Sequence, residues 1–217
     1  QGRLTSAADL VVNAGSLNNQ GTLGSNELLK ITTGSLRNER GLLFSGGDMQ
    51  LHAANLSNFY GDVYSLGTLT VARDAAGNWA DTLENVSGSL ESAGNMSLLA
   101  DTLINRKDKL TVRTERVSGS INTYADDHCK GKGCEFQFTA VEISHDVIDQ
   151  DSQAASITTG GSLTFSGNEF SNRYSSVSAA RNISIDTAVL NNIGVSGGEQ
   201  RNLNGSFYSR NRSHYSG

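Results

Sequence analysis

An asparagine recurs with a period of 19 or 20 residues through most of the chain, and this period constrains the fold more than any other feature. The positions are Asn19, Asn38, Asn58, Asn85, Asn105, Asn172 and Asn192. In most repeats a leucine stands two residues before the asparagine, and a glycine follows it two or three residues later. Self-similarity at a fixed period predicts a solenoid, in which each repeat forms one coil and buries its apolar side against the next coil.

Each repeat also contains two apolar residues that flank one polar residue, and alternation with period two indicates a β-strand. These pairs are Leu10/Val12, Leu29/Ile31, Met49/Leu51, Leu69/Val71, Met96/Leu98, Leu110/Val112, Leu163/Phe165 and Ile183/Ile185. Coils of about 20 residues with two or three short strands, stacked at about 4.8 Å, form a parallel β-helix. The sequence therefore predicts an all-β fold, a right-handed parallel β-helix with β-hairpin insertions.

Two further rows of apolar residues are expected to face the interior of the coils. They are Leu17, Leu36, Leu56, Leu83, Leu103, Phe170 and Leu190, and Leu23, Leu43, Val63 and Leu90. Each coil is expected to turn at its asparagine and again near a glycine such as Gly41 or Gly61. These two residue types tolerate a left-handed backbone at a tight corner.

Two segments interrupt the period and predict insertions. Residues 72–81 carry a Gly-Asn centre that is typical of a hairpin tip. Residues 118–156 lack the asparagine repeat, and 17 of the 39 charged residues fall between Asp101 and Asp151, so we expect an inserted β-hairpin there. Both insertions are expected to leave the coil just after the apolar pair and to form one composite surface. The predicted divisions are coils over 1–117, the insertion at 118–156, coils over 157–192, and a polar segment over 193–217.

Bulk composition excludes several classes of function. The net charge of −5 argues against a nucleic-acid binder, which ordinarily carries a basic stripe. Apolar runs are far shorter than the roughly 20 residues that a membrane span needs. No signal peptide is recognisable at the start, and we expect the chain to be a piece of a longer polypeptide that continues at both ends.

The two cysteines, Cys129 and Cys134, both fall in the larger insertion. A disulfide that closes the hairpin tip is the first interpretation, because a small excursion without a core gains stability from a covalent link. A metal site with His128 and Asp126 or Asp127 is the alternative, although the paired Cys-x-x-Cys spacing is missing. Two free thiols are the third possibility.

A carbohydrate-cleaving enzyme is disfavoured, because such a site needs carboxylates or basic residues converging on one outer face. The residues between the apolar pairs include no carboxylate: Val11, Lys30, Gln50, Thr70, Ser97, Thr111, Thr164 and Ser184. In Ser144-His145-Asp146, neighbours on a strand would point to opposite faces. We therefore expect no catalytic residue, no cofactor and no metal.

Several repeats resemble those of filamentous haemagglutinin. The resemblance rests on Gly88–Leu98 and Ile157–Phe165, followed by Leu103-Ile104-Asn105-Arg106 and Phe170-Ser171-Asn172-Arg173, and covers roughly 1–117 and 157–192. Such repeats occur in the large exoproteins of two-partner secretion, including adhesins and CdiA-type effectors of contact-dependent growth inhibition. The segment Asp74–Asp81 and the coil interrupted by a cysteine-containing loop are more similar to the CdiA type.

The resemblance implies a rod on the surface of a Gram-negative cell, exported by an outer-membrane transporter, with a toxin at its far C-terminus. It also implies a central region that binds an outer-membrane protein on a neighbouring bacterium. We expect the insertion and the 72–81 segment to provide this recognition. The candidate contact residues are Trp79, Tyr124, Asp126, Asp127, His128, Lys130 and Lys132. Phe136 and Phe138 could also be contact aromatics, but the alternative is that they only pack the insertion onto the coils. The alternative function for the whole chain is a purely structural stalk.

Overall fold

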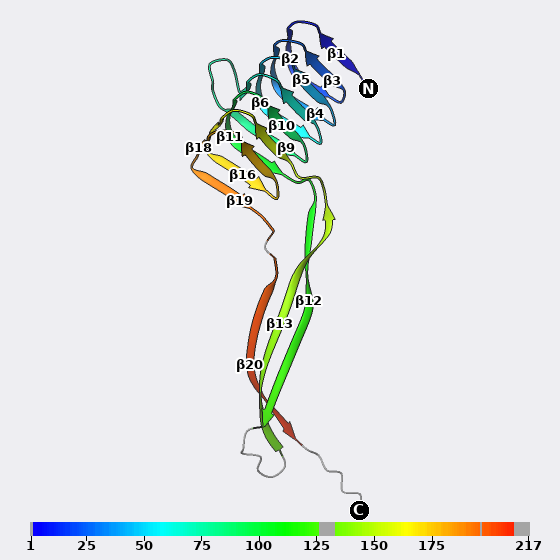
Figure 1. Ribbon diagram of the computed structural model, residues 1–217, viewed down its shortest axis with the longest axis vertical. Helices are drawn as coiled ribbons and strands as arrows, with labels where there is room; N and C mark the ends of the chain where they lie inside the picture. Colours follow the sequence, from blue (N-terminus) through cyan, green and yellow to red (C-terminus); the bar gives the residue numbers. More distant parts are fainter. Residues whose placement is uncertain (1, 126–132, 196, 211–217) are drawn as a thin grey trace, which may run out of the picture. The chain divides into compact units, whose positions relative to one another are not determined.

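The computed structural model describes residues 2–125, 133–195 and 197–210, and all regular secondary structure in them is β-strand. The chain divides into two compact units, Gln1–Leu110 with Asp151–Val195, and Thr111–Gln150 with Ser196–Gly217. The first unit is a solenoid of coils (Figure 1). The second is a three-stranded sheet. Within the described residues, no helix has the length and apolar character that a membrane crossing requires.

Each coil of the solenoid begins with a four-residue strand on one side. These strands pair in parallel in the order β1 (Arg3–Ser6), β3 (Thr22–Ser25), β5 (Leu42–Ser45), β7 (Asp62–Ser65), β10 (Ser89–Ser92), β14 (Ser156–Thr159) and β17 (Ser176–Ala179). The order rises steadily with the sequence, so that successive coils lie on top of one another. The predicted parallel β-helix is confirmed.

The rest of each coil forms the second sheet. Four coils contribute one long strand, namely β2 (Leu10–Asn19), β4 (Leu29–Glu39), β6 (Met49–Phe59) and β11 (Met96–Arg106). The other three contribute two shorter strands in the same places, namely β8 (Leu69–Ala72) with β9 (Ala80–Val86), β15 (Leu163–Ser166) with β16 (Glu169–Arg173), and β18 (Ile183–Asp186) with β19 (Val189–Ile193). All pair in parallel with their neighbours.

The register of these ladders places the predicted rows inside. Leu36 pairs with Leu17 and Leu56, and the same row continues through Leu83 and Leu103. In the coils flanked on both sides, these leucines are almost completely buried and form one continuous core with the apolar pairs. Because a single coil cannot enclose its own apolar residues, burial comes from stacking.

The asparagines form a buried hydrogen-bonded column along one corner. The Asn58 side-chain amide donates to Asn85 Oδ1 at 2.8 Å, and Asn58 Oδ1 accepts from Asn38 at 2.8 Å. The same link joins every consecutive pair from Asn19 to Asn192, at 2.8 to 2.9 Å. Asn58 also donates to the backbone carbonyls of Gly61 and Ser89, which satisfies groups that the corner withdraws from the strand ladders.

The expected conformation of this corner is wrong in one respect. The left-handed residues are Arg40, Tyr60, Ser87 and Tyr174, with φ between 49° and 54°, and neither the asparagine nor the following glycine adopts it. The glycine is required for space instead. A Cβ added to Gly88 would lie 2.5 Å from Asn58 Nδ2 and 2.6 Å from the Gly61 carbonyl oxygen. The hydrogen-bonded column therefore selects glycine beside it.

The second unit is a sheet in the order β12 (Leu110–Ala125), β13 (Gly133–Asp151) and β20 (Glu199–Arg210). β13 and β20 are antiparallel and pair from Gly133 with Arg210 to Ser144 with Glu199. Figure 1 shows β20 alongside β13 at the edge of the sheet. The segment 193–217, whose structure the sequence left undecided, thus contributes the third strand of this sheet.

Two sequence predictions differ from the fold. Leu110/Val112 is not a coil pair, because Met96/Leu98 pairs directly with Leu163/Phe165, and Leu110 instead begins β12. The coils before the excursion accordingly end at Arg106, although the sequence extended them to 117. Residues 73–79 form a loop without hairpin strands, since β8 and β9 do not pair with each other and both lie between β6 and β11.

Candidate recognition surface

The chain leaves the solenoid after Arg106 to form a long excursion. Ser87, in the preceding coil, holds the start and the end of this excursion through hydrogen bonds. This buried residue follows Asn85 and Val86 at the left-handed position of the corner. Its Oγ accepts from the Asp108 backbone N–H at 2.9 Å and donates to the Gln153 carbonyl at 2.7 Å. The corresponding residues of other coils, such as Arg40, carry large side chains. Ser87 instead provides a small hydroxyl at the place where the chain leaves the solenoid.

The outgoing and returning chains are joined at the same place. The Ser152 backbone N–H donates to the Lys109 carbonyl at 2.9 Å, and Ser152 Oγ accepts from the Lys109 N–H at 3.0 Å. Lys107 pairs with Asp151, and Tyr60 donates to Asp108 Oδ2 at 3.1 Å. The excursion therefore begins and ends at adjacent points, and the coil can continue at β14.

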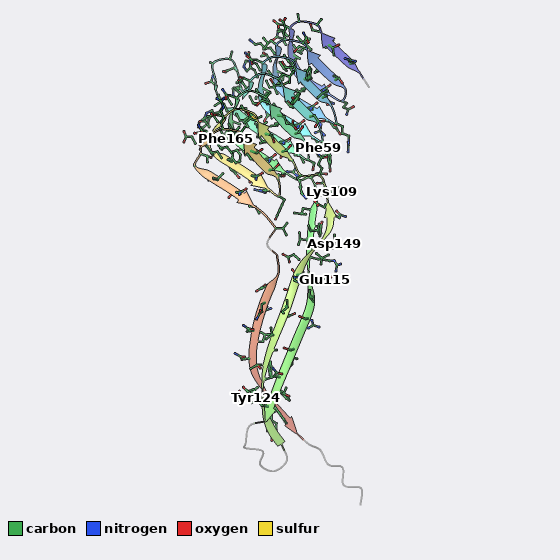
Figure 2. All side chains as sticks on the ribbon, viewed as in Figure 1. Phe59, Lys109, Glu115, Tyr124, Asp149 and Phe165 are labelled. Atoms are coloured by element: carbon green, nitrogen blue, oxygen red, sulfur yellow. The ribbon has the colours of Figure 1, made fainter. Side chains whose placement is uncertain are left out.

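The sheet of the second unit is polar and charged in its first part. Arg113 Nε donates to Asp149 at 2.7 Å, and its guanidinium also pairs with Glu115 (Figure 2). These two carboxylates, Asp149 first, raise the pKa of Arg113. On a neighbouring position, Thr114 donates to Asp146 at 3.0 Å. These contacts join β12 to β13 across the sheet.

Further along the strands the sheet becomes apolar and aromatic. Phe136 pairs with Phe207 across β13 and β20, and the two rings stack with centroids 5.3 Å apart and planes 12° apart. Phe138 pairs with Gly205, where a Cβ would lie 2.7 Å from the Phe138 ring. Phe136 and Phe138 thus pack with β20, a contact that sequence reasoning missed because 193–217 shows no clear periodicity.

None of the described side chains of the second unit is buried. Ile121 is 70% exposed and Tyr124 is 56% exposed, and Figure 2 places Tyr124 toward the far end of β12. Phe207 and Tyr208 on β20 are also exposed. Exposed aromatic residues are enriched at protein interaction surfaces. We refer to Ile121, Tyr124, Phe207 and Tyr208 as the aromatic segment; Phe136, which stacks on Phe207, is half-buried.

The loop 73–79 presents Trp79, which is 40% exposed. Arg73 stabilises the loop through its Nε, which donates to the Trp79 carbonyl at 3.1 Å, and through an ion pair with Asp81. The side chain of Asp74 accepts from Asn78 Nδ2 at 2.8 Å, and this hydrogen bond is the main reason that the pKa of Asp74 is lowered.

The two insertions do not leave the coil at the same point. The loop departs after Ala72, which pairs with His52 in the middle of a long strand. The excursion departs after Arg106, which pairs with Val86 at the end of the strand row. The expectation of a common departure point is therefore wrong, because it relied on assigning Leu110/Val112 to a coil.

Most of the predicted contact residues lie outside the described residues. These are Asp126, Asp127, His128, Lys130 and Lys132, together with Cys129, while the side chain of Cys134 is also outside the description. The disulfide, the metal site and the free thiols therefore remain predictions. Among the residues that the structure does describe, no three His, Cys, Asp or Glu side chains are grouped as metal ligands.

The outward row formed by the residues between the apolar pairs carries no carboxylate. Lys30 pairs with Val11 and Gln50, and the row continues through Thr70, Ser97, Thr164 and Ser184. Thr111, which the sequence placed in this row, belongs to β12. The solvated row offers no converging acids or bases for glycoside chemistry.

Stacked parallel coils, an internal asparagine column and a β-sheet excursion define a parallel β-helix solenoid built from sequence repeats. The sequence profile of the haemagglutinin repeat matches residues 1–42, 29–78, 66–115 and 147–204. The chain belongs to the haemagglutinin-repeat family.

Two curated relatives share this region. The chain is 35% identical over 99 residues to a deoxyribonuclease CdiA of Dickeya dadantii. The aligned residues make up 45% of the chain and 3% of that protein. It is 32% identical over 128 residues to a 16S rRNA endonuclease CdiA of Enterobacter cloacae, which covers 58% of the chain and 4% of that protein. The chain thus corresponds to a small part of each relative. No solved structure matches it significantly.

Proposed function

We propose that this chain is a non-catalytic recognition segment of a large secreted exoprotein of the CdiA type. The sheet β12–β13–β20, and above all its aromatic segment, contacts a protein of the outer membrane on a neighbouring bacterium. The solenoid carries this sheet on the cell surface, and any toxin activity resides elsewhere in the exoprotein. The match to the haemagglutinin repeat and the small share of each relative that is covered support the role as one segment.

The exposure of the aromatic segment carries the proposal. A shaft needs only to bury its apolar rows, and the solenoid does so while its outward row consists mostly of polar residues. The sheet instead holds Ile121 and Tyr124 open to solvent. Aromatic side chains supply much of the binding energy at protein interfaces, because they bury a large area with few rotatable bonds.

Removal of the sheet tests the proposal. Residues 110–151 are replaced by Gly-Gly, which the 2.9 Å hydrogen bond between Ser152 and Lys109 allows, and the chain is ended after 195. The expected result is a folded solenoid that no longer retains a protein from outer-membrane extracts of target cells. A control variant shortens only the loop 74–78. Undiminished retention by the variant without the sheet would favour a purely structural stalk.

A finer variant addresses the aromatic segment itself. Tyr124→Ser and Phe207→Ser together remove two exposed rings, and the matched control is Thr70→Ser with Thr164→Ser on the outward row of the solenoid. Retention of the outer-membrane protein is expected to fall at least about tenfold in the first variant, since losing two contact aromatics costs roughly 1.4 kcal/mol or more. It is expected to be unchanged in the control.

A further inference from the structure

One edge of the sheet in the second unit has no neighbouring strand among the described residues. β12 stands at the end of the strand order β12–β13–β20, so only one of its two sides is paired (Figure 1). The side chains of β12 from Thr111 to Tyr124 are all exposed. An edge strand presents a row of free backbone N–H and C=O groups, and proteins ordinarily protect it with charged side chains, proline or a bulge.

The second half of β12 lacks charged side chains and proline. Residues 117–125 contain no charged side chain, and the chain contains no proline. The charged residues of this strand all come before Val117. Val117 is 55% exposed and Ile121 is 70% exposed, and both lie on one face because side chains alternate along a strand. The strand therefore combines an open hydrogen-bonding edge with two exposed aliphatic side chains.

Gly119 lies between these two aliphatic residues, and packing within the chain does not account for it. A Cβ added there would meet only the Val141 carbonyl oxygen, at 3.3 Å. The glycine borders a hollow of about 380 Å³ that extends to Leu203. Gly205 on the opposite edge strand differs, because a Cβ there would lie 2.7 Å from the Phe138 ring. Space inside the sheet thus explains Gly205 but not Gly119.

The sequence of this edge is complementary to itself when two copies run antiparallel around Gly119. The facing residues of the two copies would be Val117 with Ile121, Ser118 with Ser120, and Arg116 with Asn122. Like charges directly opposite each other destabilise a pair of strands, and this register contains none. The two exposed aliphatic side chains of each copy would instead lie opposite each other. At the centre, two glycines would meet without any side chain between them.

We propose that β12 is the docking edge for a second copy of the chain, with the two strands antiparallel and Gly119 of both copies at the two-fold axis. The two sheets join into one sheet of six strands, three from each copy. Each copy contributes the same surface, so the assembly closes at two copies and does not extend into a filament. Pairing at the edge leaves both faces of the sheet accessible, and the proposal does not depend on recognition of an outer-membrane protein.

Sedimentation of the 217-residue chain tests the pairing. The expected result is a concentration-dependent change from the 23.0 kDa monomer to a dimer. A thiol reductant is present throughout, so that the cysteines cannot link two copies. A monomer at every concentration up to about 1 mM would overturn the proposal. Assemblies larger than a dimer would also overturn it, because an interface of this symmetry closes.

Charged substitutions beside the axis test the register. Ser118→Lys with Ser120→Lys places lysines opposite each other, and Ser118→Glu with Ser120→Glu places carboxylates opposite each other. Each variant alone is expected to raise the dissociation constant of the dimer at least about tenfold. A mixture of the two is expected to recover a dimer, because each lysine then faces a glutamate. Recovery also shows that both variants fold, and a mixture that stays monomeric would contradict the proposed pairing.

The opposite edge of the sheet provides the matched control. Asn204→Lys with Ser206→Lys flanks Gly205 on β20 as the first variant flanks Gly119 on β12. The control is expected to leave the dissociation constant unchanged. If it separated the dimer while the β12 variants did not, the docking edge would be β20 and the proposal would fail.

Discussion

The side-chain amide of Asn58 donates to Asn85 Oδ1 at 2.8 Å across 27 residues of sequence, the same distance that joins Asn38 to Asn58 across 20. The longer interval contains the loop 73–79, which leaves the coil and returns without changing the register of Leu56 with Leu83. The hydrogen-bonded column therefore fixes the position of each coil independently of the chain length between them.

Asn58→Asp is expected to destabilise the solenoid strongly. The substitution replaces an amide that donates to Asn85, Gly61 and Ser89 by a carboxylate facing the same acceptor oxygens in a buried site. The loss should be on the order of 3–5 kcal/mol in the free energy of unfolding, measured by urea denaturation. Asn192→Asp, at the exposed end of the column, serves as the control and should cost less than about 1 kcal/mol. Equal effects would argue against the column as a source of stability.

Gly88→Ala is expected to displace the asparagine column by steric overlap. The added Cβ would approach Asn58 Nδ2 to 2.5 Å, whereas a Cβ on Gly15 would meet no atom within 4 Å. Overpacking of this kind costs roughly 1–3 kcal/mol. The melting temperature should fall for Gly88→Ala and remain almost constant for Gly15→Ala. If both variants melted alike, glycine would be present at position 88 for reasons other than space.

Ser87→Ala is expected to loosen the start and end of the excursion. The variant loses an acceptor for the Asp108 N–H and a donor to the Gln153 carbonyl. Hydrogen exchange at Asp108, Lys109 and Ser152 should become faster, with a local loss of about 1–3 kcal/mol. Ser97→Ala, on the outward row, should leave these amides unchanged. Unaltered exchange in Ser87→Ala would show that the strand pairing holds the excursion without this hydroxyl.

His52 predicts a pH dependence of stability. Burial, and then the charge of Lys30, lower its pKa from the ordinary value of 6.5, against an opposing effect of Asp74. The unfolded chain therefore binds more protons below pH 6.5, so this contribution to stability is complete above that pH and is lost as the pH falls toward the folded pKa. The melting temperature should decline from about pH 7.5 to about pH 5. His52→Gln should flatten part of this decline, and an unchanged slope would refute the assignment.

The solenoid was predictable because its signals repeat. Leu36, Leu56 and Leu83 could be aligned because each stands two residues before an asparagine, and the parallel register follows once the asparagines are matched. The family resemblance was also confirmed. The left-handed residues were not predictable, because Arg40 and Ser87 differ in size and charge and only their place after the asparagine defines them.

The excursion was harder to delimit for a physical reason. Leu110/Val112 has the alternation of a coil strand, and a strand of an antiparallel hairpin shows the same period of two. Sequence alone could not assign the pair to one or the other. The pairing of Phe136 with Phe207 depends on a contact between residues 71 positions apart, and nothing in the polar composition around Phe207 indicated its partner.

The hydrogen bond between Ser152 and Lys109 brings the two ends of the excursion together. The segment of more than 40 residues between them therefore replaces a short corner connection of the solenoid. What is carried between these two ends can change in length and sequence while the coils beneath it keep their register. A solenoid built in this way allows one excursion to be replaced by another, for example by grafting in the laboratory.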